Sequence, residues 1–417
     1  LLACLLDRPF DAVSAYYRSR PLLLTLGLSL EDAFCGPLGK SGGYSDGRDI
    51  GVVCNFPNPG GPCVLPMAGD VGSQYTPSSG WAEAIEYYQY VLGDERYKEC
   101  ISVVCGGEGS VATNGFWSAL TMATTLNLPQ LFFIEDNGYA ISVPSDKQTP
   151  GGNIADNLRS FNNLHIVEGD GCNPEEAAAC ISEAVSFVRL GQTPALIRLE
   201  VPRLCGHSGQ DSQAYKEPEE LKEELERDPL PRLKEFLVPA HFSEDEWSAI
   251  AHEASTEVDA ALEAALNRAE PDPQYIKRFA FSERANVPSN TANAKPLTDG
   301  PRINMLEGIR RVLSTELASN PKVAVFGEDV GPKGGVHAAT MGLQELFGEY
   351  RVFDTSLSEE GIIGRAVGMA IAGLVPVAEI QFRKYADPAT EQLNNCGTIR
   401  WRTNNRFSAP ITVRMAG

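Results

Sequence analysis

The chain has 417 residues, enough for two ordinary domains, and it is 43% apolar and 22% charged, as is typical of globular proteins. Its formal net charge of −20 argues against nucleic acid as the main partner, because phosphate binding requires a basic surface. No apolar run reaches the roughly 18 residues that cross a bilayer, so we expect no membrane partner.

The cysteines and the chain ends set further limits. Ten cysteines occur without a CxxC pair, and their irregular spacing favours free thiols over a disulfide framework. Cys54 and Cys63 have no matching second pair, which argues against zinc. The chain begins without Met and stops directly after the strand-like run "PITVRM". We therefore expect residues 1–417 to be a portion of a longer polypeptide.

Strand-like and helix-like stretches alternate through the first part of the chain. The apolar runs predict strands, and the longer periodic runs predict helices, in the order strand 100–105, helix 116–127, strand 129–135, helix 174–191 and strand 194–201. Such alternation predicts an α/β domain with a parallel sheet and helices on both faces. We assign this domain to residues 1–280.

Two acidic runs and a linker follow. Residues 216–228 form a charge run that we interpret as the solvated face of a helix over 217–227. A helix over 243–268 is expected to open with the capping-box spacing of Ser243 and Glu246. Residues 281–301 are rich in Ser, Asn, Pro and Ala, which predicts a linker.

The α/β pattern then restarts over residues 302–417. The expected order is helix 303–320, strand 322–330, helix 361–374, strand 375–382, helix 386–404 and strand 410–415. This pattern predicts a second α/β domain with a parallel sheet, incomplete at its C-terminal end.

Two polar residues follow consecutive predicted strands. Glu108 comes after the first strand and Asn137 after the second, so one crossover should bring both side chains to the same edge of the sheet. Carboxylate and amide oxygens suit Mg²⁺ bound with a diphosphate, and Gly107 and Gly109 would allow close backbone approach. Glycine turns and Asp-Asn-Gly turns also occur without ligands, so spacing alone leaves a purely structural role open.

The residues themselves resemble a known family. The runs "GEG" (107–109) and "DNGYAIS" (136–142) resemble the thiamine-diphosphate motif in the α subunit of the first, decarboxylating component of 2-oxo acid dehydrogenase complexes. Other runs also resemble that subunit, namely "YYR" (16–18), "GDVGSQ" (69–74), "GHSGQD" (206–211) and "RDPL" (227–230). The second domain resembles the β subunit in "GEDVGPKGGV" (327–336), in 342–364 and in "VPVAEIQF" (375–382).

The resemblance implies a fused α–β chain with two thiamine-diphosphate-binding-type domains, closest in motif to branched-chain 2-oxo acid dehydrogenase. It implies that thiamine diphosphate is held with Mg²⁺, and that Glu108, the Asn137 side chain and the Tyr139 carbonyl are the metal ligands. Other residues would surround the cofactor, namely Tyr17, Arg18 and His207 at the diphosphate, Gly69 and Val71 at the rings, and Gly107, Gly109 and Ser110 in the glycine loop. Without the family context, Tyr17 reads as core, Arg18 as a surface charge and His207 as a loop histidine.

Glu359 and His207 would be catalytic. By resemblance to the family motif P-L-x-E-x-G, Glu359 would bond the aminopyrimidine ring nitrogen and so promote removal of the thiazolium proton. Its neighbour Glu360 is the alternative, and both could instead be an acidic pair at a helix N-terminus.

The implied reaction is oxidative decarboxylation of a 2-oxo acid, either a branched-chain 2-oxo acid or pyruvate. The acyl group would pass to the lipoyl domain of a dihydrolipoyl acyltransferase, in a multienzyme complex. The resemblance also implies a homodimer of fused chains, and the fusion favours a bacterial cytoplasm over a mitochondrial matrix.

Several positions depart from the family pattern. The segment 47–56 lacks the expected histidine, the segment 113–119 differs from the expected acidic motif, Lys216 stands where Arg is usual, and Glu135 places an acid near the diphosphate. The family's acyl-transfer histidine would lie beyond Gly417. Alternatives are an acetoin dehydrogenase, a transketolase-like enzyme, and a catalytically inactive scaffold that binds a partner domain.

Overall fold

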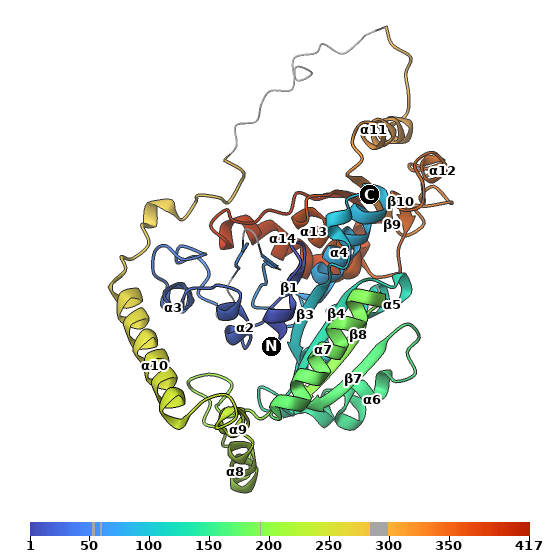
Figure 1. Ribbon diagram of the computed structural model, residues 1–417. Helices are drawn as coiled ribbons and strands as arrows, with labels where there is room; N and C mark the ends of the chain where they lie inside the picture. Colours follow the sequence, from blue (N-terminus) through green and yellow to red (C-terminus); the bar gives the residue numbers. More distant parts are fainter. Residues whose placement is uncertain (52–54, 59–60, 192, 284–298) are drawn as a thin grey trace. The chain divides into compact units, whose positions relative to one another are not determined.

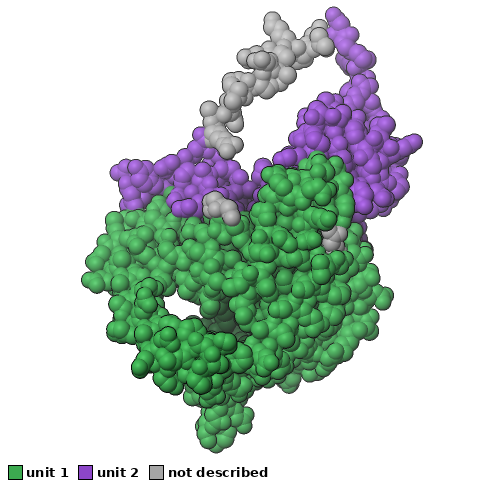
Figure 2. Space-filling view, in the orientation of Figure 1, with its two compact units in different colours: residues 1–271 green, residues 272–417 purple. Residues whose placement is uncertain are grey.

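The computed structural model describes residues 1–51, 55–58, 61–191, 193–283 and 299–417. The chain forms two compact units, Leu1–Pro271 and Asp272–Gly417, drawn in green and purple in Figure 2. Most of the linker expected over 281–301 lies outside the described residues.

The first unit is built on a six-stranded parallel sheet with the strand order β2-β1-β3-β4-β8-β7. Strands β1, β3, β4, β8 and β7 are labelled in Figure 1. Its strands are β1 (Ala12–Ser14), β2 (Cys63–Val64), β3 (Ser102–Gly107), β4 (Gln130–Asp136), β7 (His165–Asp170) and β8 (Ala195–Glu200). A short antiparallel hairpin joins β5 (Tyr139–Ala140) to β6 (Val143–Pro144). The predicted parallel α/β sheet is confirmed.

The helices of this unit include those expected over 116–127, 174–191, 217–227 and 243–268, together with others that the sequence pattern did not predict. They are α1 (Leu2–Leu5), α2 (Arg20–Thr25), α3 (Leu30–Leu38), α4 (Tyr75–Glu86), α5 (Asn114–Leu126), α6 (Ile154–Leu158), α7 (Pro174–Gly191), α8 (Pro218–Glu226), α9 (Pro229–Leu237) and α10 (Glu244–Asn267). The capping box predicted for Ser243 and Glu246 is present at the start of α10.

Alternating side chains of the central strands explain why both faces of the sheet are covered. In β4, Leu131 and Phe133 belong to one buried cluster, together with residues of α7, while Phe132 and Ile134 belong to another, together with residues of α5. Phe132 is fully buried, and burying a side chain of this size contributes about 1.5–3 kcal/mol. The strand therefore reads as a continuous apolar run, as expected for a parallel sheet buried on both sides.

The second unit holds a four-stranded parallel sheet with the order β10-β9-β11-β12. Its strands are β9 (Val323–Gly327), β10 (Val352–Asp354), β11 (Val375–Ile380) and β12 (Thr412–Met415), and its helices are α11 (Met305–Ser319), α12 (Leu343–Phe347), α13 (Glu359–Ile371) and α14 (Thr390–Arg402). Helix α13 is buried from Glu360 to Ala370, and apart from Glu360 and Arg365 its buried residues are glycines or apolar.

Several observed elements have no counterpart among the expected ones, including the 12-residue helix α4 and a number of short or polar strands. Strands β1, β2 and β10 have only two or three residues, too few to form a clear pattern. Edge strand β7 carries His165, Glu168 and Asp170 among its six residues, so it has no apolar run. The solvated-face prediction is correct for α8, which has no buried residue, but wrong for Lys216, which is 6% exposed.

None of the helices built from the described residues combines the length and apolar character that a membrane span requires. Of the described residues, nine are cysteines, and all nine are free thiols in the structure.

Candidate cofactor site

Glu108 and Asn137 meet at the carboxyl edge of the first sheet. Strand β3 ends at Gly107, and Glu108 begins the 3₁₀ turn Glu108–Ala112 that follows it. Strand β4 pairs with β3 in parallel, and Asn137 comes directly after its last residue. The backbone N–H of Asn137 donates to Oε2 of Glu108 over 3.1 Å. The crossover therefore brings these two residues together as the sequence predicts.

Glu108 sits in an environment that favours a nearby cation. Its side chain is only 3% exposed. Burial raises the pKa of Glu108 to about 7, the Asn137 hydrogen bond opposes this rise, and the charge of Asp136 adds to it. A divalent cation would offset both the burial cost and the repulsion between carboxylates.

The turn after β4 is fixed by its own side chains. Oδ1 of Asp136 accepts from the N–H of Gly138 over 3.0 Å, and Oδ1 of Asn137 accepts from the N–H of Tyr139 over 3.3 Å. Gly138 has φ +77°, a conformation that glycine adopts without strain. These two successive Asx turns fix the backbone from Asp136 to Tyr139, and the Asn137 N–H within this segment is the group that contacts Glu108.

A cluster of basic and aromatic groups holds the chain that continues from this turn. Ile141 has φ +56°, a rare conformation for a β-branched residue. Its carbonyl oxygen accepts from Nη1 of Arg203 over 2.5 Å and from the Tyr215 hydroxyl over 2.9 Å. The Arg203 guanidinium also lies 5.3 Å from the centre of the Tyr139 ring. Sequence reasoning missed Arg203, because nothing in the run "VPRL" marks this arginine as buried.

Lys216, which stands where the family usually has arginine, packs against Tyr139. Its ammonium lies 4.7 Å from the centre of the Tyr139 ring and 2.6 Å from both carboxylate oxygens of Glu224. Lys216 is therefore a buried cation that is paired with Glu224 and packs against the Tyr139 ring.

Tyr17, Arg18 and His207 come together although nearly 190 residues separate the first two from the third. The rings of Tyr17 and His207 meet edge to face at 5.7 Å, and the Arg18 guanidinium lies 5.3 Å from the centre of the Tyr17 ring. Burial lowers the pKa of His207, and the charges of Arg18 and Arg203 lower it further. His207 and Arg18 therefore both lie against the Tyr17 ring, and an imidazole together with a guanidinium fork suits an anionic ligand.

The loop that carries His207 is held at its start by a backbone hydrogen bond and a close glycine contact. The backbone N–H of His207 donates to Oδ2 of Asp211 over 2.7 Å, and hydrogen bonds from His207 and Gln213 lower the pKa of Asp211 to about 2. A Cβ atom on Gly206 would lie 2.0 Å from the backbone oxygen of Asp211, so only glycine fits at this position.

Glu135, the acid expected near the diphosphate, is hydrogen-bonded within the unit. Its Oε2 accepts from the Tyr16 hydroxyl over 2.7 Å. Burial raises the pKa of Glu135, whereas this hydrogen bond and the charge of Arg18 lower it. Both Arg18 and Glu135 line a cavity of about 290 Å³ with mainly apolar walls, so the acid has a cationic neighbour there.

The loop that carries Gly69 and Val71 is attached to the carboxyl end of β3. Nε2 of Gln74 donates to the carbonyl of Cys105 over 3.1 Å. Gly72 has φ +97°, and a Cβ atom there would lie 2.2 Å from Oγ1 of Thr113, just after the Glu108 turn. Val71 is 50% exposed and Gly69 has open space around it, so both remain accessible.

The glycine loop itself is tightly packed. A Cβ atom on Gly109 would lie 2.4 Å from Cβ of Ala140 in the hairpin, whereas Gly107 has ordinary space. Oγ of Ser110 lies 2.6 Å from the Tyr75 hydroxyl and donates to the carbonyl of Gly107 over 2.6 Å. In the structure Gly109 is required by the hairpin that passes over it, and Ser110 stabilises the turn from inside.

The two candidate carboxylates of the second unit lie in different environments. Glu359 is the first residue of α13 and is partly exposed, whereas Glu360 is 4% exposed and accepts from Nε2 of Gln392 over 3.0 Å. Burial raises the pKa of Glu328, and the charge of Glu359 raises it further, so these two carboxylates are close neighbours. Glu359 is thus the accessible carboxylate of the pair.

Within the residues that the structure describes, no group of three or more His, Cys, Asp or Glu side chains could hold a metal ion on its own. One carboxylate, one amide oxygen and a backbone carbonyl are an incomplete set of hard oxygen donors. Mg²⁺ is commonly bound by one or two carboxylates together with phosphate oxygens of a ligand. The donors around Glu108 therefore fit Mg²⁺ bound with a diphosphate.

Comparison with known families agrees with this geometry. Residues 1–274, about two thirds of the chain, match the model of the dehydrogenase E1 component. The chain belongs to the dehydrogenase E1 component family. Residues 302–416 match the pyrimidine-binding domain of transketolase, so this E1 chain joins an α-type and a β-type domain. Both families depend on thiamine diphosphate, typically with Mg²⁺ or a similar divalent ion.

Curated relatives of this E1 chain are β subunits of 2-oxo acid dehydrogenases. A 2-oxoisovalerate dehydrogenase subunit beta from Pseudomonas aeruginosa is 45% identical over 124 residues, covering 30% of this chain and 35% of the relative. A chloroplastic pyruvate dehydrogenase E1 component subunit beta-4 from Oryza sativa is 38% identical over 141 residues, covering 34% and 35% respectively. The matched segments thus span about a third of the length of these curated relatives.

Proposed function

We propose that the chain catalyses the thiamine-diphosphate-dependent oxidative decarboxylation of a 2-oxo acid. The observation that carries the proposal is the convergence of Glu108 and Asn137, with 3.1 Å between the Glu108 carboxylate and the Asn137 N–H. The family match supports it, because the relatives include both a 2-oxoisovalerate dehydrogenase and a pyruvate dehydrogenase subunit. We infer a branched-chain 2-oxo acid or pyruvate as substrate.

In the first unit, residues would bind and orient the cofactor. Glu108, the Asn137 side chain and the Tyr139 carbonyl would hold Mg²⁺, and the Asx turns would fix their positions. Tyr17, Arg18 and His207 would bind the diphosphate, His207 as a hydrogen-bond donor and Arg18 as a charged fork. The open loop with Gly69 and Val71 would contact the rings, and Gly107, Gly109 and Ser110 would form the wall behind the metal.

In the second unit, Glu359 would hold a proton at the aminopyrimidine ring nitrogen. Its position at the accessible N-terminus of α13 supports this role. Thiamine diphosphate, when bound, supplies the nucleophilic carbon and the electron sink that 2-oxo acid decarboxylation requires.

We further propose that the acyl group is transferred to a lipoyl domain of a partner dihydrolipoyl acyltransferase. A homodimer of fused chains in a bacterial cytoplasm is our accompanying proposal. The relative from Pseudomonas aeruginosa supports a bacterial setting.

The test is an assay of the full-length protein with thiamine diphosphate and Mg²⁺. Pyruvate, 2-oxoglutarate and 3-methyl-2-oxobutanoate are offered separately, and reduction of an artificial acceptor is followed. We expect turnover of 3-methyl-2-oxobutanoate or pyruvate, and loss of that turnover in Glu359→Ala. Cofactor binding without turnover of any of the three acids would overturn the proposal, and turnover of acetoin or a sugar phosphate instead would favour the alternative enzymes.

A further inference from the structure

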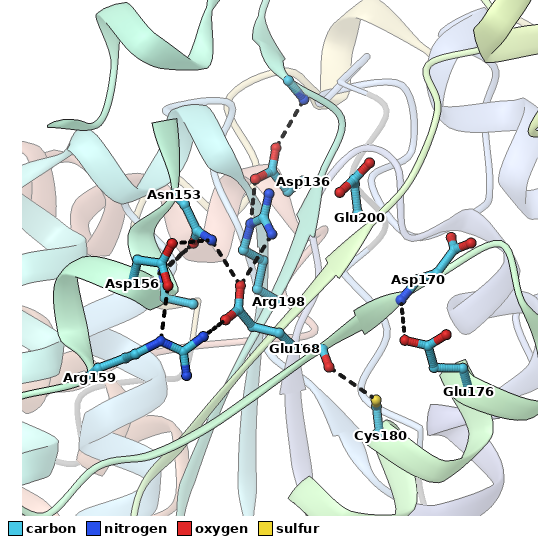
Figure 3. A network of polar contacts seen from close by, with 12 residues as sticks. Asp136, Asn153, Asp156, Arg159, Glu168, Asp170, Glu176, Cys180, Arg198 and Glu200 are labelled. Atoms are coloured by element: carbon cyan, nitrogen blue, oxygen red, sulfur yellow. Dashed lines mark hydrogen bonds and ion pairs between the residues drawn. The ribbon is translucent and has the colours of Figure 1, made fainter. Parts of the chain in front are cut away.

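A network of charged side chains extends across the neighbouring strands β4, β8 and β7 (Figure 3). It ends at Asp136, in the turn that carries Asn137. Arg198 in β8 donates from Nε to Oδ2 of Asp136 over 2.6 Å and from Nη1 to Oε1 of Glu168 over 3.3 Å. Asp136 ends β4, and Glu168 lies directly opposite Arg198 in β7. One guanidinium therefore bridges carboxylates on both neighbouring strands.

The far end of this network fixes Glu168. Nδ2 of Asn153 donates to Oε1 of Glu168 over 2.9 Å, and Arg159 donates to its other carboxylate oxygen. Nε of Arg159 also donates to Oδ1 of Asp156 over 2.9 Å, so Asp156 belongs to the same network. Glu168 is thus held on several sides, and so it can fix the orientation of the Arg198 guanidinium plane.

The near end of the network fixes Asp136. This carboxylate is 4% exposed, and its two oxygens have different partners, Oδ2 with Arg198 and Oδ1 with the N–H of Gly138. The carbonyl oxygen of Asp136 also accepts from the N–H of Val201 over 2.8 Å, in the chain that follows β8. Because the carboxylate is rigid, the Asx turn that presents Asn137 is rigid as well.

Removing the arginine would leave a buried carboxylate close to Glu108. Such a charge is costly in a dry environment, so Asp136 would rotate toward water and release the N–H of Gly138. The turn would then lose the bond that orders the residues on either side of Asn137.

We propose that Arg198 is a positioning residue for the metal site, acting through Asp136 on the turn that carries Asn137 and Tyr139. The inference rests on the proposed function, since it takes Glu108, Asn137 and the Tyr139 carbonyl as the metal ligands. Residues behind metal ligands typically change metal affinity when they are replaced, even though they never touch the ion.

The experiment measures divalent-metal binding directly in the full-length protein. Mn²⁺ is titrated in the presence of thiamine diphosphate and followed by electron paramagnetic resonance, and the Mg²⁺ dependence of turnover is measured beside it. In Arg198→Met we expect about a tenfold to hundredfold weaker Mn²⁺ affinity. Turnover at saturating Mg²⁺ should fall much less than the affinity, because the ligands themselves remain.

Two further variants make the test specific. Arg159→Met removes an arginine from the same network without touching Asp136, and since this arginine is largely exposed, we expect less than about a threefold change in affinity. The double variant Asp136→Asn with Arg198→Met removes both charges while an asparagine oxygen can still accept from Gly138. We expect it to recover most of the lost affinity, which a merely structural role would not predict.

The outcomes separate the two proposals. Unchanged Mn²⁺ affinity in Arg198→Met, with strong loss in Glu108→Gln, would overturn the positioning role and leave the metal site standing. Unchanged affinity in both variants would reject the proposed metal site itself. Equal losses in Arg198→Met and Arg159→Met, without recovery in the double variant, would show general destabilisation and would also overturn the positioning role.

Discussion

The backbone N–H of Asn137 lies 3.1 Å from Oε2 of Glu108, so one predicted metal ligand is hydrogen-bonded to the residue that carries the other. Glu108 follows β3 and Asn137 follows β4, so this hydrogen bond links the carboxyl ends of two neighbouring strands. The carboxylate is therefore oriented before any cation arrives, which lowers the cost of ordering it on binding.

Replacing the buried Glu108 should weaken divalent-metal affinity more than replacing a residue that only supports the metal ligands. In Glu108→Gln we expect divalent-metal affinity to fall by more than about a hundredfold, above the range typical of outer residues, because the charge is lost. Mn²⁺ binding with thiamine diphosphate present is the measurement. Glu175→Gln, an exposed carboxylate at the start of α7, is the matched control. Equal affinities in the two variants would contradict the assignment.

The charge of Arg18 should be visible in the titration of His207. Burial is the largest cause of the lowered pKa of His207, and Arg18 is the next. Arg18→Met removes one cation near the imidazole, so the pKa of His207 should rise toward its ordinary value of 6.5. Nuclear magnetic resonance titration of the imidazole carbon-bound protons measures it. Arg232→Met, which removes a charge paired with Asp170, should leave that titration unchanged.

Glu108 and Asn137 could be predicted from the sequence because their positions depend only on strand order and on where each strand ends. Arg198 and Arg203 could not, because a charged residue in or after a strand reads as solvent-facing unless its partners are known. Their partners, Asp136 and the Ile141 carbonyl, lie about 60 residues away in the chain. Lys216 illustrates the same limit, since its burial depends on Glu224 and the Tyr139 ring rather than on its acidic neighbours.

Gly72 should be intolerant of a side chain. It has φ +97°, and a Cβ atom would lie 2.2 Å from Oγ1 of Thr113. We expect Gly72→Ala to lower the free energy of unfolding by about 1–3 kcal/mol, from backbone strain and the clash together. Gly69→Ala, in the same loop with open space around it, should change it by less than about 0.5 kcal/mol. Urea unfolding without cofactor measures both, and equal losses would show that the contact with Thr113 is unimportant.

Glu86, at the end of α4, should make stability depend on pH. Burial raises the pKa of Glu86 to about 8, and the charge of Glu83 adds to the rise. Because the folded protein holds this proton more tightly than the unfolded chain, its contribution to stability is greatest below about pH 4.5. That contribution falls as the pH rises through the folded pKa near 8.

Glu86→Gln tests this dependence, because glutamine stays neutral at every pH. Relative to Glu86→Gln, the native protein should lose on the order of 3 kcal/mol of unfolding free energy between pH 5 and pH 9. Urea unfolding at several pH values in that range measures the difference. A constant difference between the two proteins across the range would contradict the raised pKa of Glu86.

Replacing the adjacent residues Glu359 and Glu360 should have different effects, on catalysis in the first case and on stability in the second. Glu359 is accessible at the first position of α13, so Glu359→Ala should lower kcat by about a hundredfold to ten-thousandfold, the range for loss of a proton-transfer group. Its cost in stability should stay below about 1 kcal/mol, the contribution of one acid at a helix N-terminus. Glu360 is buried and bonded to Gln392, so Glu360→Ala should instead lower the melting temperature, with kcat largely retained in the folded fraction. Steady-state kinetics and thermal unfolding of both variants decide the matter, and the reverse pattern would move the catalytic role to Glu360.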